Sequence, residues 1–561
     1  MNDAIYSELT YMKKHLVFLL SFPFQLMGQS LHDSVTRKID SIFSRYTTTT
    51  PGCAVAIIKN DKVVFKKGYG MSNLEYNVPI TPSSIFHIAS ESKQYVAFCM
   101  LLLEQQGKLS LDDDIRKHLD YVPDFGKKIT IRHLIHHTSG LRDQWQLLAN
   151  AGWQLDDVIT QEHVIKLVSK QKALNFEPGE EHLYCNTGYT LMAEIVKKAS
   201  GLSLREYTDK NIFKPLEMSN THFHDNYREI VPNRTYSYSP GGSNGYSHSV
   251  LSYSTVGATS LFTTVEDEAK WVMNYEHGKV GGKDLLQKMY SQGILNSGKK
   301  ITYAFAINMG EYKGWKEIGH GGGDAGFRTY ATRFPEQQVG IIVFSNLASF
   351  NSYGMAMQVA DLLLPPKEKS SDKPSVFADS NVLKKWVGRY LSPRGNMLHL
   401  SWSNGRLVNR QPGQTTGGTE WKLVAKENNK YQLNDGPFLL PETSSSTDSV
   451  AKIVFENPNS FTEYLRQPAI VLKKEEMQGY AGTYYNDETE AAYTVLVKDG
   501  DLVLQHRKFA DVKLSAVGAD QFSCPNWWMS NLKFVRDKKG VITGFEVNAG
   551  RVLHLYYARK K

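Results

Sequence analysis

The feature that most constrains the fold is an apolar run from Tyr95 to Leu103, preceded by Ser90-Glu-Ser-Lys93 and followed by Gly107. The run is too long and too apolar for a loop, and a glycine just beyond such a run is a helix stop signal. We therefore predict a buried helix with Ser90 at its N-terminus. Lys93 then lies on the same face as Ser90, one turn later.

The spacing of Ser90 and Lys93 points to nucleophilic chemistry. A serine hydroxyl must lose its proton before the oxygen attacks, and a neighbouring amine with a lowered pKa takes that proton. Backbone N–H groups at the helix N-terminus stabilise negative charge that develops there. A capping serine followed by a solvated lysine has the same spacing, so the motif alone leaves both interpretations open.

Composition places the chain among globular proteins with more than one domain. It has 561 residues, of which 41% are hydrophobic and 22% charged. The formal net charge is +8 without a dense Lys/Arg block, so nucleic acid is not an expected partner. The four cysteines, which form no Cys-x-x-Cys pair, indicate neither a metal site nor a disulfide framework; they are Cys53, Cys99, Cys185 and Cys524.

Residues 12–30 have the pattern of a secretory signal: Lys13-Lys14-His15, an apolar run at 16–27, and Gly28-Gln29-Ser30. We expect residues 1–30 to be an N-terminal extension and signal peptide, with Met12 as the true start; a buried core helix is the alternative. No later segment is long and apolar enough for a membrane helix. The mature protein is therefore expected in the periplasm of a bacterium or outside the cell, without membrane insertion.

Residues 31–364 mix strand and helix patterns. Strands are predicted at 53–58 and 62–65, joined by Lys59-Asn60-Asp61, and at 303–309, 326–334 and 339–344. Helices are predicted at 164–168, 190–199 and 266–275. Strands at both ends with helices between them predict an α+β domain whose antiparallel sheet joins the two ends of the segment.

The composition changes after residue 364. Residues 365–378 are rich in proline, serine and charge, which is typical of a linker. Beyond the linker, Trp386-Val-Gly-Arg-Tyr390 is echoed by Tyr480-Ala-Gly-Thr-Tyr484, and each is followed at similar spacing by a turn, Asn404-Gly405 or Asp499-Gly500. This duplication predicts two small antiparallel β-barrels of lipocalin-like type, at 379–470 and 471–561.

A second polar motif, Tyr184-Cys-Asn186, follows the turn Phe176-Glu-Pro-Gly179 and precedes a helix. In an alternating loop the side chains of Tyr184 and Asn186 point the same way. A phenol serves as a proton acceptor where a nearby cation lowers its pKa, and an amide can hold a substrate carbonyl. An ordinary packed tyrosine is the alternative.

A third motif, His320-Gly-Gly-Gly323, precedes a strand. Glycines there permit close approach of another backbone or of a ligand and expose main-chain N–H groups. A β-turn with a surface histidine is the alternative. Neither His320 nor the pair His136-His137 has a second ligand at helical spacing, so no metal site is expected.

Taken in order, Ser90-x-x-Lys93, Tyr184-x-Asn186 and His320-Gly-Gly322 resemble the serine β-lactamase-like and penicillin-binding hydrolases, closest to class C β-lactamases, D-aminopeptidases and related esterases. Two further landmarks, His133–Leu141 and Phe176-Glu-Pro-Gly179, support the resemblance, which covers about residues 35–365.

The resemblance implies that Ser90 forms an acyl-enzyme, that Lys93 and Tyr184 share proton transfer, and that Asn186 positions the substrate. Backbone N–H groups of Ser90 and of a residue near Gly323 would form an oxyanion hole, with His320 and Gly322 at the substrate subsite. The resemblance implies no metal or organic cofactor.

One departure bears on the substrate. β-Lactamases and many transpeptidases of this resemblance carry Lys-Thr-Gly where this chain has His320-Gly-Gly322. Histidine is mostly neutral at pH 7 and suits a substrate carboxylate poorly; Arg328 is the cation that would restore the charge. We therefore predict a peptidase or carboxylesterase of D-aminopeptidase type, acting on a small peptide, amide or ester without a carboxylate at that subsite.

The alternatives are a β-lactamase or D-Ala-D-Ala carboxypeptidase, and, in another class, a non-catalytic protein that binds cell-wall fragments. The C-terminal barrels also resemble the extra domains of D-aminopeptidases. A loop at Pro525-Asn-Trp527-Trp528 reaching over the active site is one interpretation. Packing of both tryptophans in a barrel core or interdomain seam is the favoured one.

Overall fold

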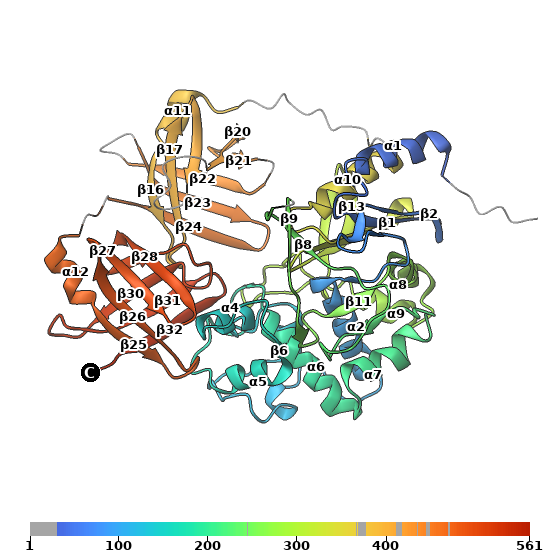
Figure 1. The fold of residues 1–561 in the computed structure, drawn as a ribbon, viewed down its shortest axis with the longest axis horizontal. Helices are drawn as coiled ribbons and strands as arrows, with labels where there is room; N and C mark the ends of the chain where they lie inside the picture. Colours follow the sequence, from blue (N-terminus) through green and yellow to red (C-terminus); the bar gives the residue numbers. More distant parts are fainter. Residues whose placement is uncertain are drawn as a thin grey trace, which may run out of the picture.

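The computed structural model describes residues 31–561 except 244, 366, 368–376, 411–417, 435, 445–448, 469 and 471. The predicted signal peptide and most of the predicted linker lie outside the described residues. Three parts follow one another along the chain: an α+β part, a nine-stranded sheet and a closed barrel that ends at the C-terminus (Figure 1).

A six-stranded sheet with the order β12-β13-β14-β15-β1-β2 forms the centre of the α+β part. Its strands are β1 (Cys53–Lys59), β2 (Lys62–Tyr69), β12 (Asn308–Tyr312), β13 (Trp315–Asp324), β14 (Phe327–Phe334) and β15 (Val339–Ser345). β1 and β15 are antiparallel, with Cys53 opposite Ser345 and Lys59 opposite Val339. The predicted meeting of the two ends of this segment in one sheet is therefore confirmed.

Alternate residues of β1 enter two different cores. Val55 packs with α1 (Asp33–Phe43) and α10 (Ser352–Leu363), whereas Ala56 faces α2 (Ser92–Gln105) and α8 (Val265–His277). Helices thus cover both faces of the sheet, and this explains why β1 is a continuous apolar run rather than an alternating one.

The predicted central helix is α2. Every residue from Ser92 to Leu103 is buried, so this helix is apolar all round and lies inside the core. It ends at Gln105, and Gly107 follows with a positive φ of 67°. Ser90 was predicted at the N-terminus of this helix; it lies just before the helix, in a 3-10 turn (Ala89–Glu91) that leads into α2.

The other predicted helices are also present, as α5 (Gln161–Ser169), α6 (Asn186–Ser200) and α8. The remaining helices of this part are α3 (Ile131–Ile135), α4 (Gln144–Asn150), α7 (Leu204–Thr208) and α9 (Gly282–Lys288). Short strands complete it: β3 (Met71–Asn73), β4 (Val78–Pro79), β5 (Phe86–His87), β6 (Ile159–Thr160), β7 (His222–Phe223), β8 (Tyr238–Pro240), β9 (Tyr246–His248), β10 (Tyr253–Ser254) and β11 (Leu261–Thr263).

One strand prediction was wrong. Residues 303–309 form no continuous strand, because Ala306 has a φ of +56° and the chain turns before β12 begins at Asn308. The glycines after His320 do precede the predicted strand, which is β14, but they lie inside another strand, β13, and not in the turn that was the alternative. Glycine has low strand propensity, so the sequence pattern there favoured a loop.

The first C-terminal part is a nine-stranded antiparallel sheet with the order β19-β18-β17-β16-β24-β23-β22-β21-β20. Its elements are α11 (Ser380–Lys384), β16 (Gly388–Leu391), β17 (Met397–Ser403), β18 (Arg406–Arg410), β19 (Thr419–Glu420), β20 (Leu423–Ala425), β21 (Tyr431–Leu433), β22 (Phe438–Thr443), β23 (Val450–Asn457) and β24 (Ser460–Gln467). The predicted antiparallel architecture is confirmed, but in the described residues the end strands β19 and β20 do not pair to close a barrel.

The second C-terminal part is a closed eight-stranded barrel. Its elements are α12 (Lys474–Tyr480), β25 (Gly482–Asn486), β26 (Ala491–Lys498), β27 (Asp501–His506), β28 (Phe509–Gly518), β29 (Gln521–Ser523), β30 (Asn531–Arg536), β31 (Ile542–Ala549) and β32 (Val552–Arg559). The predicted duplication extends to contacts. Tyr390 donates its hydroxyl to Trp386 O at 2.9 Å, and Tyr484 donates to Tyr480 O at 2.7 Å.

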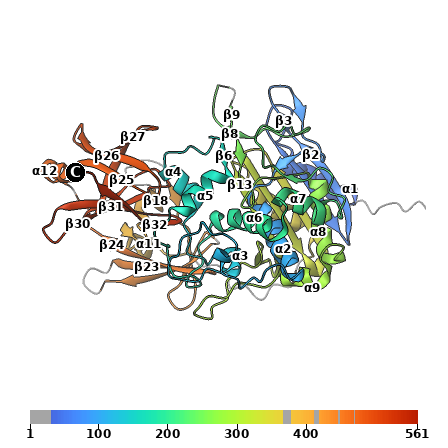
Figure 2. The same ribbon diagram turned by 90° about the horizontal axis from the view of Figure 1, so that it is seen from below.

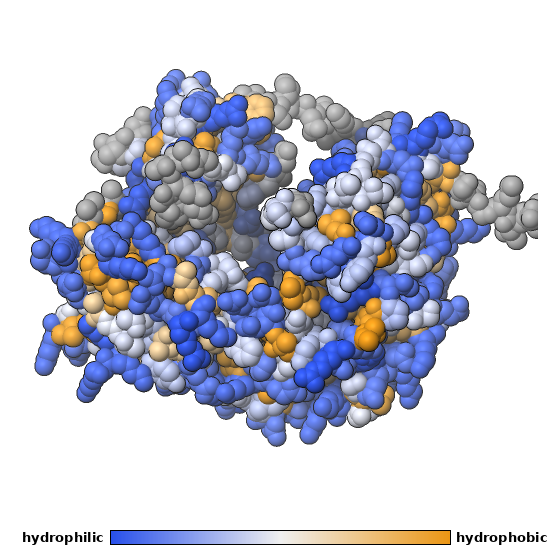
Figure 3. Space-filling model, viewed as in Figure 1, coloured by the Kyte–Doolittle hydropathy of each residue, from blue (hydrophilic) through white to orange (hydrophobic). Residues whose placement is uncertain are grey.

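The barrel lies against α4 and α5 of the α+β part, as two perpendicular views show (Figures 1 and 2). The two parts share one apolar core, in which Trp145 and Leu148 pack with barrel residues such as Tyr493. The surface is hollowed between the nine-stranded sheet and the α+β part (Figure 3). No helix in the described part of the chain is long and apolar enough to cross a membrane.

Candidate active site

β13 packs tightly against the turn Ala89–Glu91, which precedes α2, and this contact holds Ser90 in place. Ala89 has a φ of +49°, a conformation that costs a non-glycine residue free energy. A Cβ added at Gly322 would lie 2.2 Å from the carbonyl oxygen of Ile88. Thr329 donates its hydroxyl to that same oxygen at 3.1 Å. The strand therefore presses directly on the turn that carries Ser90, and only glycine permits the approach.

Lys93 is fully buried beside Ser90. Its Nζ lies 3.0 Å from Ser90 Oγ, 2.9 Å from Asn186 Oδ1 and 2.6 Å from Ala258 O. Burial lowers the pKa of Lys93 to about 7. A neutral amine has two N–H donors and one lone pair. Because the amide and carbonyl oxygens take both donors, the lone pair is directed at the Ser90 hydroxyl.

Asn186 is positioned by the start of a helix rather than by an alternating loop. It is the first residue of α6, and both its backbone N and its Nδ2 donate to Asp143 Oδ2 at 2.8 Å. Those two bonds orient Oδ1 toward Lys93. Tyr184 lies just before the helix, with its ring centroid 5.0 Å from Lys93 Nζ. The predicted meeting of Tyr184, Asn186 and Lys93 is therefore present, for a different local reason.

The expectation that a cation lowers the pKa of Tyr184 is met only in part. Burial raises the pKa of Tyr184, while Ser90 and the Arg551 guanidinium oppose that rise without cancelling it. The hydroxyl is buried and has no hydrogen-bond partner among the described residues. Tyr184 is therefore a phenol at neutral pH, better suited to passing a proton on than to taking the first one.

His320 lies in β13 and is buried. Its Nδ1 lies 2.7 Å from Gly321 O and donates to it, so Nε2 accepts from the Tyr303 hydroxyl at 3.0 Å. Burial lowers the pKa of His320 to about 4, so the ring is neutral at pH 7. Arg328 donates to the carbonyl oxygens of Ala325 and Phe327 at 3.0 and 2.6 Å and does not line the cavity.

Ser90 opens into a cavity of about 690 Å³ that the α+β part and the barrel line together. Tyr184, Asn186, His320 and Gly323 also line it, whereas Gly322 is covered by the Ser90 turn. The barrel contributes Trp527, Gly550 and Arg551. The favoured interpretation of the tryptophan loop was therefore wrong for Trp527, whose side chain borders the cavity and is 47% exposed. Trp528 does pack against the shared core.

Three charged lining residues escaped the sequence analysis: Asp143, Asp324 and Arg551. Asp143 caps α4 by accepting from Trp145 N at 3.1 Å. Asp324, at the end of β13, accepts from the Thr259 hydroxyl and lies 3.0 Å from His87 Nε2. In the sequence, Asp143 had a weak signal as a helix cap, and Asp324 had a weak signal as the end of a strand. Arg551 had none, because only the docking of the barrel brings it to Ser90.

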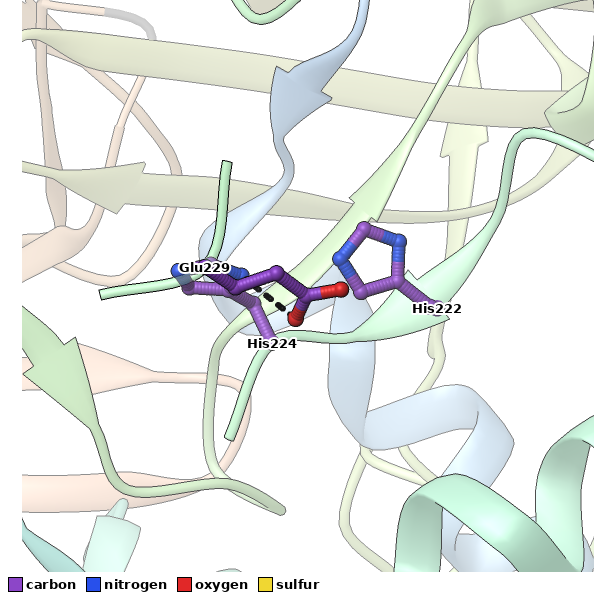
Figure 4. Close-up of side chains that lie close together, drawn as sticks. All are labelled: His222, His224 and Glu229. Atoms are coloured by element: carbon purple, nitrogen blue, oxygen red, sulfur yellow. Dashed lines mark ion pairs between the residues drawn. The ribbon is translucent and has the colours of Figure 1, made fainter. Parts of the chain in front are cut away.

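One cluster away from this cavity has metal-ligating groups. His222, His224 and Glu229 place one ligand atom each within 4.8 Å of one another (Figure 4). Arg205, however, donates to both Glu229 oxygens at 2.6 and 2.7 Å and already neutralises the carboxylate. None of the three residues lines the Ser90 cavity, so we assign them no part in its chemistry.

Comparison with known proteins places these features in context. A family model described as Beta-lactamase matches residues 39–364. A D-aminopeptidase from Brucella anthropi is 25% identical over 537 residues, which cover 91% of this chain and 95% of that protein.

Two solved structures share the fold. A penicillin-binding protein homologue from Pyrococcus abyssi, described as octameric, matches with a TM-score of 0.53 at 23% identity, covering 85% of this chain and 99% of its own. A D-amino acid amidase from Ochrobactrum anthropi matches with a TM-score of 0.50 at 20% identity, covering 59% of this chain and 98% of its own.

Proposed function

This chain belongs to the beta-lactamase family and is a serine hydrolase, and on that basis we propose that it cleaves an amide or ester bond through an acyl-enzyme on Ser90. The observation that carries the proposal is the 3.0 Å contact between Lys93 Nζ and Ser90 Oγ. A buried amine with a pKa of about 7 is half neutral at physiological pH, which is the state a general base needs.

Neutral Lys93 takes the proton as Ser90 Oγ forms a bond to the substrate carbonyl carbon. The tetrahedral intermediate collapses when the bond to the leaving nitrogen or oxygen breaks. The proton passes from Lys93, through the Tyr184 hydroxyl, to that leaving atom. Water then attacks the ester on Ser90 and gives one proton to Lys93. As the bond between the acyl carbon and Ser90 Oγ breaks, Lys93 returns this proton to Oγ, which releases the acid product and restores free serine and neutral Lys93. Atoms and protons balance over the cycle.

The oxyanion hole that we propose uses backbone N–H groups of Ser90 and Gly323. Both residues line the cavity. β12 pairs with β13 only as far as Gly319, so no strand in the described part of the chain covers the outer edge of β13 from His320 onward. Main-chain groups on that edge are free to face a substrate. Donors preorganised in this way stabilise the charge that develops in the transition state.

Among substrates, a small D-aminoacyl peptide or amide is our first choice. The D-aminopeptidase relative matches across the α+β part and both C-terminal parts, because it aligns with 91% of this chain. The second of the C-terminal parts, the barrel, supplies Trp527 and Arg551 to the cavity here. We further propose export through the segment at 12–30; N-terminal sequencing of a mature chain that begins before Leu16 would contradict export.

The acyl-enzyme is tested by intact-protein mass after brief reaction with a p-nitrophenyl ester. We expect the mass of one acyl group on the wild type and none on Ser90→Ala. A matched serine variant, Ser110→Ala at an exposed position, should retain the adduct. Turnover that is equal in wild type and Ser90→Ala contradicts the proposal, and the absence of both adduct and turnover favours the non-catalytic binding protein.

A further inference from the structure

Arg551 is the one cationic residue among those lining the Ser90 cavity in the described part of the chain. The two lining histidines, His182 and His320, are neutral at pH 7, because burial lowers the pKa of each to about 4. Arg551 lies in the turn between β31 and β32, with its Cζ 4.9 Å from the ring centroid of Tyr184.

The backbone around Arg551 is held by the α+β part. Its N donates to Gln146 Oε1 at 2.8 Å, and its O accepts from Asn175 Nδ2 at 2.9 Å and from Asp143 N at 3.2 Å. Bonds on both sides of the peptide fix the position of this residue relative to Ser90. The guanidinium is therefore delivered to the cavity by a rigid contact between two parts of the chain.

The N–H donors of the Arg551 guanidinium remain available for a ligand. Arg551 forms a long ion pair with Asp143, in which Nη1 lies 3.8 Å from Oδ2, and that oxygen already accepts two hydrogen bonds from Asn186. No acceptor among the described residues lies within hydrogen-bond distance of the Arg551 side chain, which is 44% exposed. A planar fork of N–H donors in the same cavity as the nucleophile, with only this long ion pair to Asp143 in the described part of the chain, suits a carboxylate.

We propose that Arg551 is a substrate-binding residue that receives a carboxylate of the substrate, so that the barrel supplies the cation that the His320 strand lacks. This inference rests on the proposed function and narrows its substrate class to peptides, amides or esters with a free carboxylate within reach of Arg551. It replaces the expectation of a substrate without a carboxylate: the His320 subsite is neutral as predicted, but a cation reaches the cavity from another part of the chain.

The first test compares kcat/KM for p-nitrophenyl hydrogen glutarate, which carries a terminal carboxylate, with that for neutral p-nitrophenyl butyrate. In Arg551→Gln we expect the ratio of the two values to fall by about tenfold to a hundredfold, as for loss of a charge-assisted pair. Arg551→Lys should recover part of the ratio. Arg507→Gln, an exposed arginine in another turn of the same barrel, should leave it unchanged.

The second test needs no turnover. In Ser90→Ala protein, calorimetry measures the binding of D-alanyl-D-alanine and of its C-terminal amide, with and without Arg551→Gln. A preference for the acid that Arg551→Gln removes supports the inference. If neither the ester ratio nor this binding preference changes in Arg551→Gln, the inference is overturned, whether or not Ser90 forms an acyl-enzyme. Equal ester rates in wild type and Ser90→Ala contradict the proposed function separately.

Discussion

Arg142 Nη1 lies 2.6 Å from Glu488 Oε2, and both side chains are buried between the α+β part and the barrel. The same guanidinium donates to the carbonyl oxygens of Leu553 and His554 at 2.9 and 2.8 Å. Arg142 thus binds β32 directly, and the first of these two carbonyl oxygens belongs to Leu553, which lies two residues after Arg551. The ion pair therefore ties the docking of the barrel to the shape of the Ser90 cavity.

Arg142→Met should destabilise the protein by about 3–5 kcal/mol, because it leaves the Glu488 carboxylate buried without its partner. Thermal unfolding measures the change. Lys498→Ala removes an exposed ion pair with Asp511 in the same barrel and is expected to change the melting temperature little. Equal shifts in the two variants would contradict a special role for the buried pair.

Lys93→Ala should lower kcat/KM on a neutral ester by about a hundredfold to ten-thousandfold, the range for loss of a general base. The rate of p-nitrophenol release, measured over a range of ester concentrations, gives kcat/KM for both proteins. Lys108→Ala, an exposed position just beyond α2, is the matched control and should keep the wild-type rate. A Lys93→Ala enzyme that turns over normally while folded would remove Lys93 from the mechanism.

The pH dependence of the rate has a defined sign. Lys93 acts only without its proton, and burial lowers the pKa of Lys93 to about 7. kcat/KM should therefore rise with pH through about 7 and level off above it, since kcat/KM reports groups of the free enzyme. A profile that is flat across this range, with the fold intact by circular dichroism, is the contrary result.

Much of this site was predictable from the sequence because its parts are local. Ser90 and Lys93 meet through helical spacing, and an apolar run as long as Tyr95–Leu103 leaves little choice but a buried helix. Tyr184, Asn186 and His320 were found through an ordered resemblance, although Asn186 is oriented by the start of a helix and by Asp143. Local patterns and motif order thus carried the nucleophile and its immediate neighbours.

The rest depended on contacts between segments far apart in the chain. Arg551 and Asp143 are separated by hundreds of residues and meet only because the barrel docks on α4. The glycines after His320 were predicted to permit close approach of another backbone, and Gly322 does lie against Ile88, but the sequence did not identify Ile88 as the partner or β13 as the strand that carries Gly322. No periodicity or spacing encodes such contacts, since they follow from how whole parts pack together.

Gly322→Ala should impair both stability and activity. The added Cβ would lie 2.2 Å from Ile88 O and 2.4 Å from Thr329 Oγ1, so β13 must move away from the Ser90 turn. We expect a loss of about 1–3 kcal/mol, as for overpacking, and a lower ester rate. Gly479→Ala in α12, where an added Cβ meets nothing within 4 Å, should not destabilise the protein. A crystal structure of Gly322→Ala with Ser90 unmoved would contradict this account.

Two buried carboxyl groups behind the nucleophile predict a second pH effect, on stability. Glu91 follows Ser90 directly and has no hydrogen-bond partner for either carboxyl oxygen among the described residues. Glu268 accepts from the Tyr95 hydroxyl at 2.7 Å. Burial raises the pKa of Glu268 to about 7, and burial together with the Glu268 charge raises the pKa of Glu91. Below about pH 7 the folded protein therefore holds Glu268 mainly in its neutral, protonated form, and the Glu91 carboxyl also keeps its proton to a higher pH than an exposed carboxyl does.

The direction of this pH effect follows from the number of protons that the folded and the unfolded protein bind. Between the ordinary value of 4.5 and about 7, folded Glu268 keeps a proton that the unfolded chain has released. Its contribution to the free energy of unfolding is therefore present below pH 4.5 and is lost as the pH rises toward about 7. Glu268→Gln, which stays neutral, should be relatively more stable as the pH rises through this window.

Buried histidines such as His320 act in the opposite direction over part of the window, so the difference between wild type and Glu268→Gln is the quantity to measure. Urea unfolding at several pH values gives that difference, with Glu336→Gln at a surface turn as the control. A difference that does not change with pH would mean that Glu268 titrates as an ordinary exposed carboxyl.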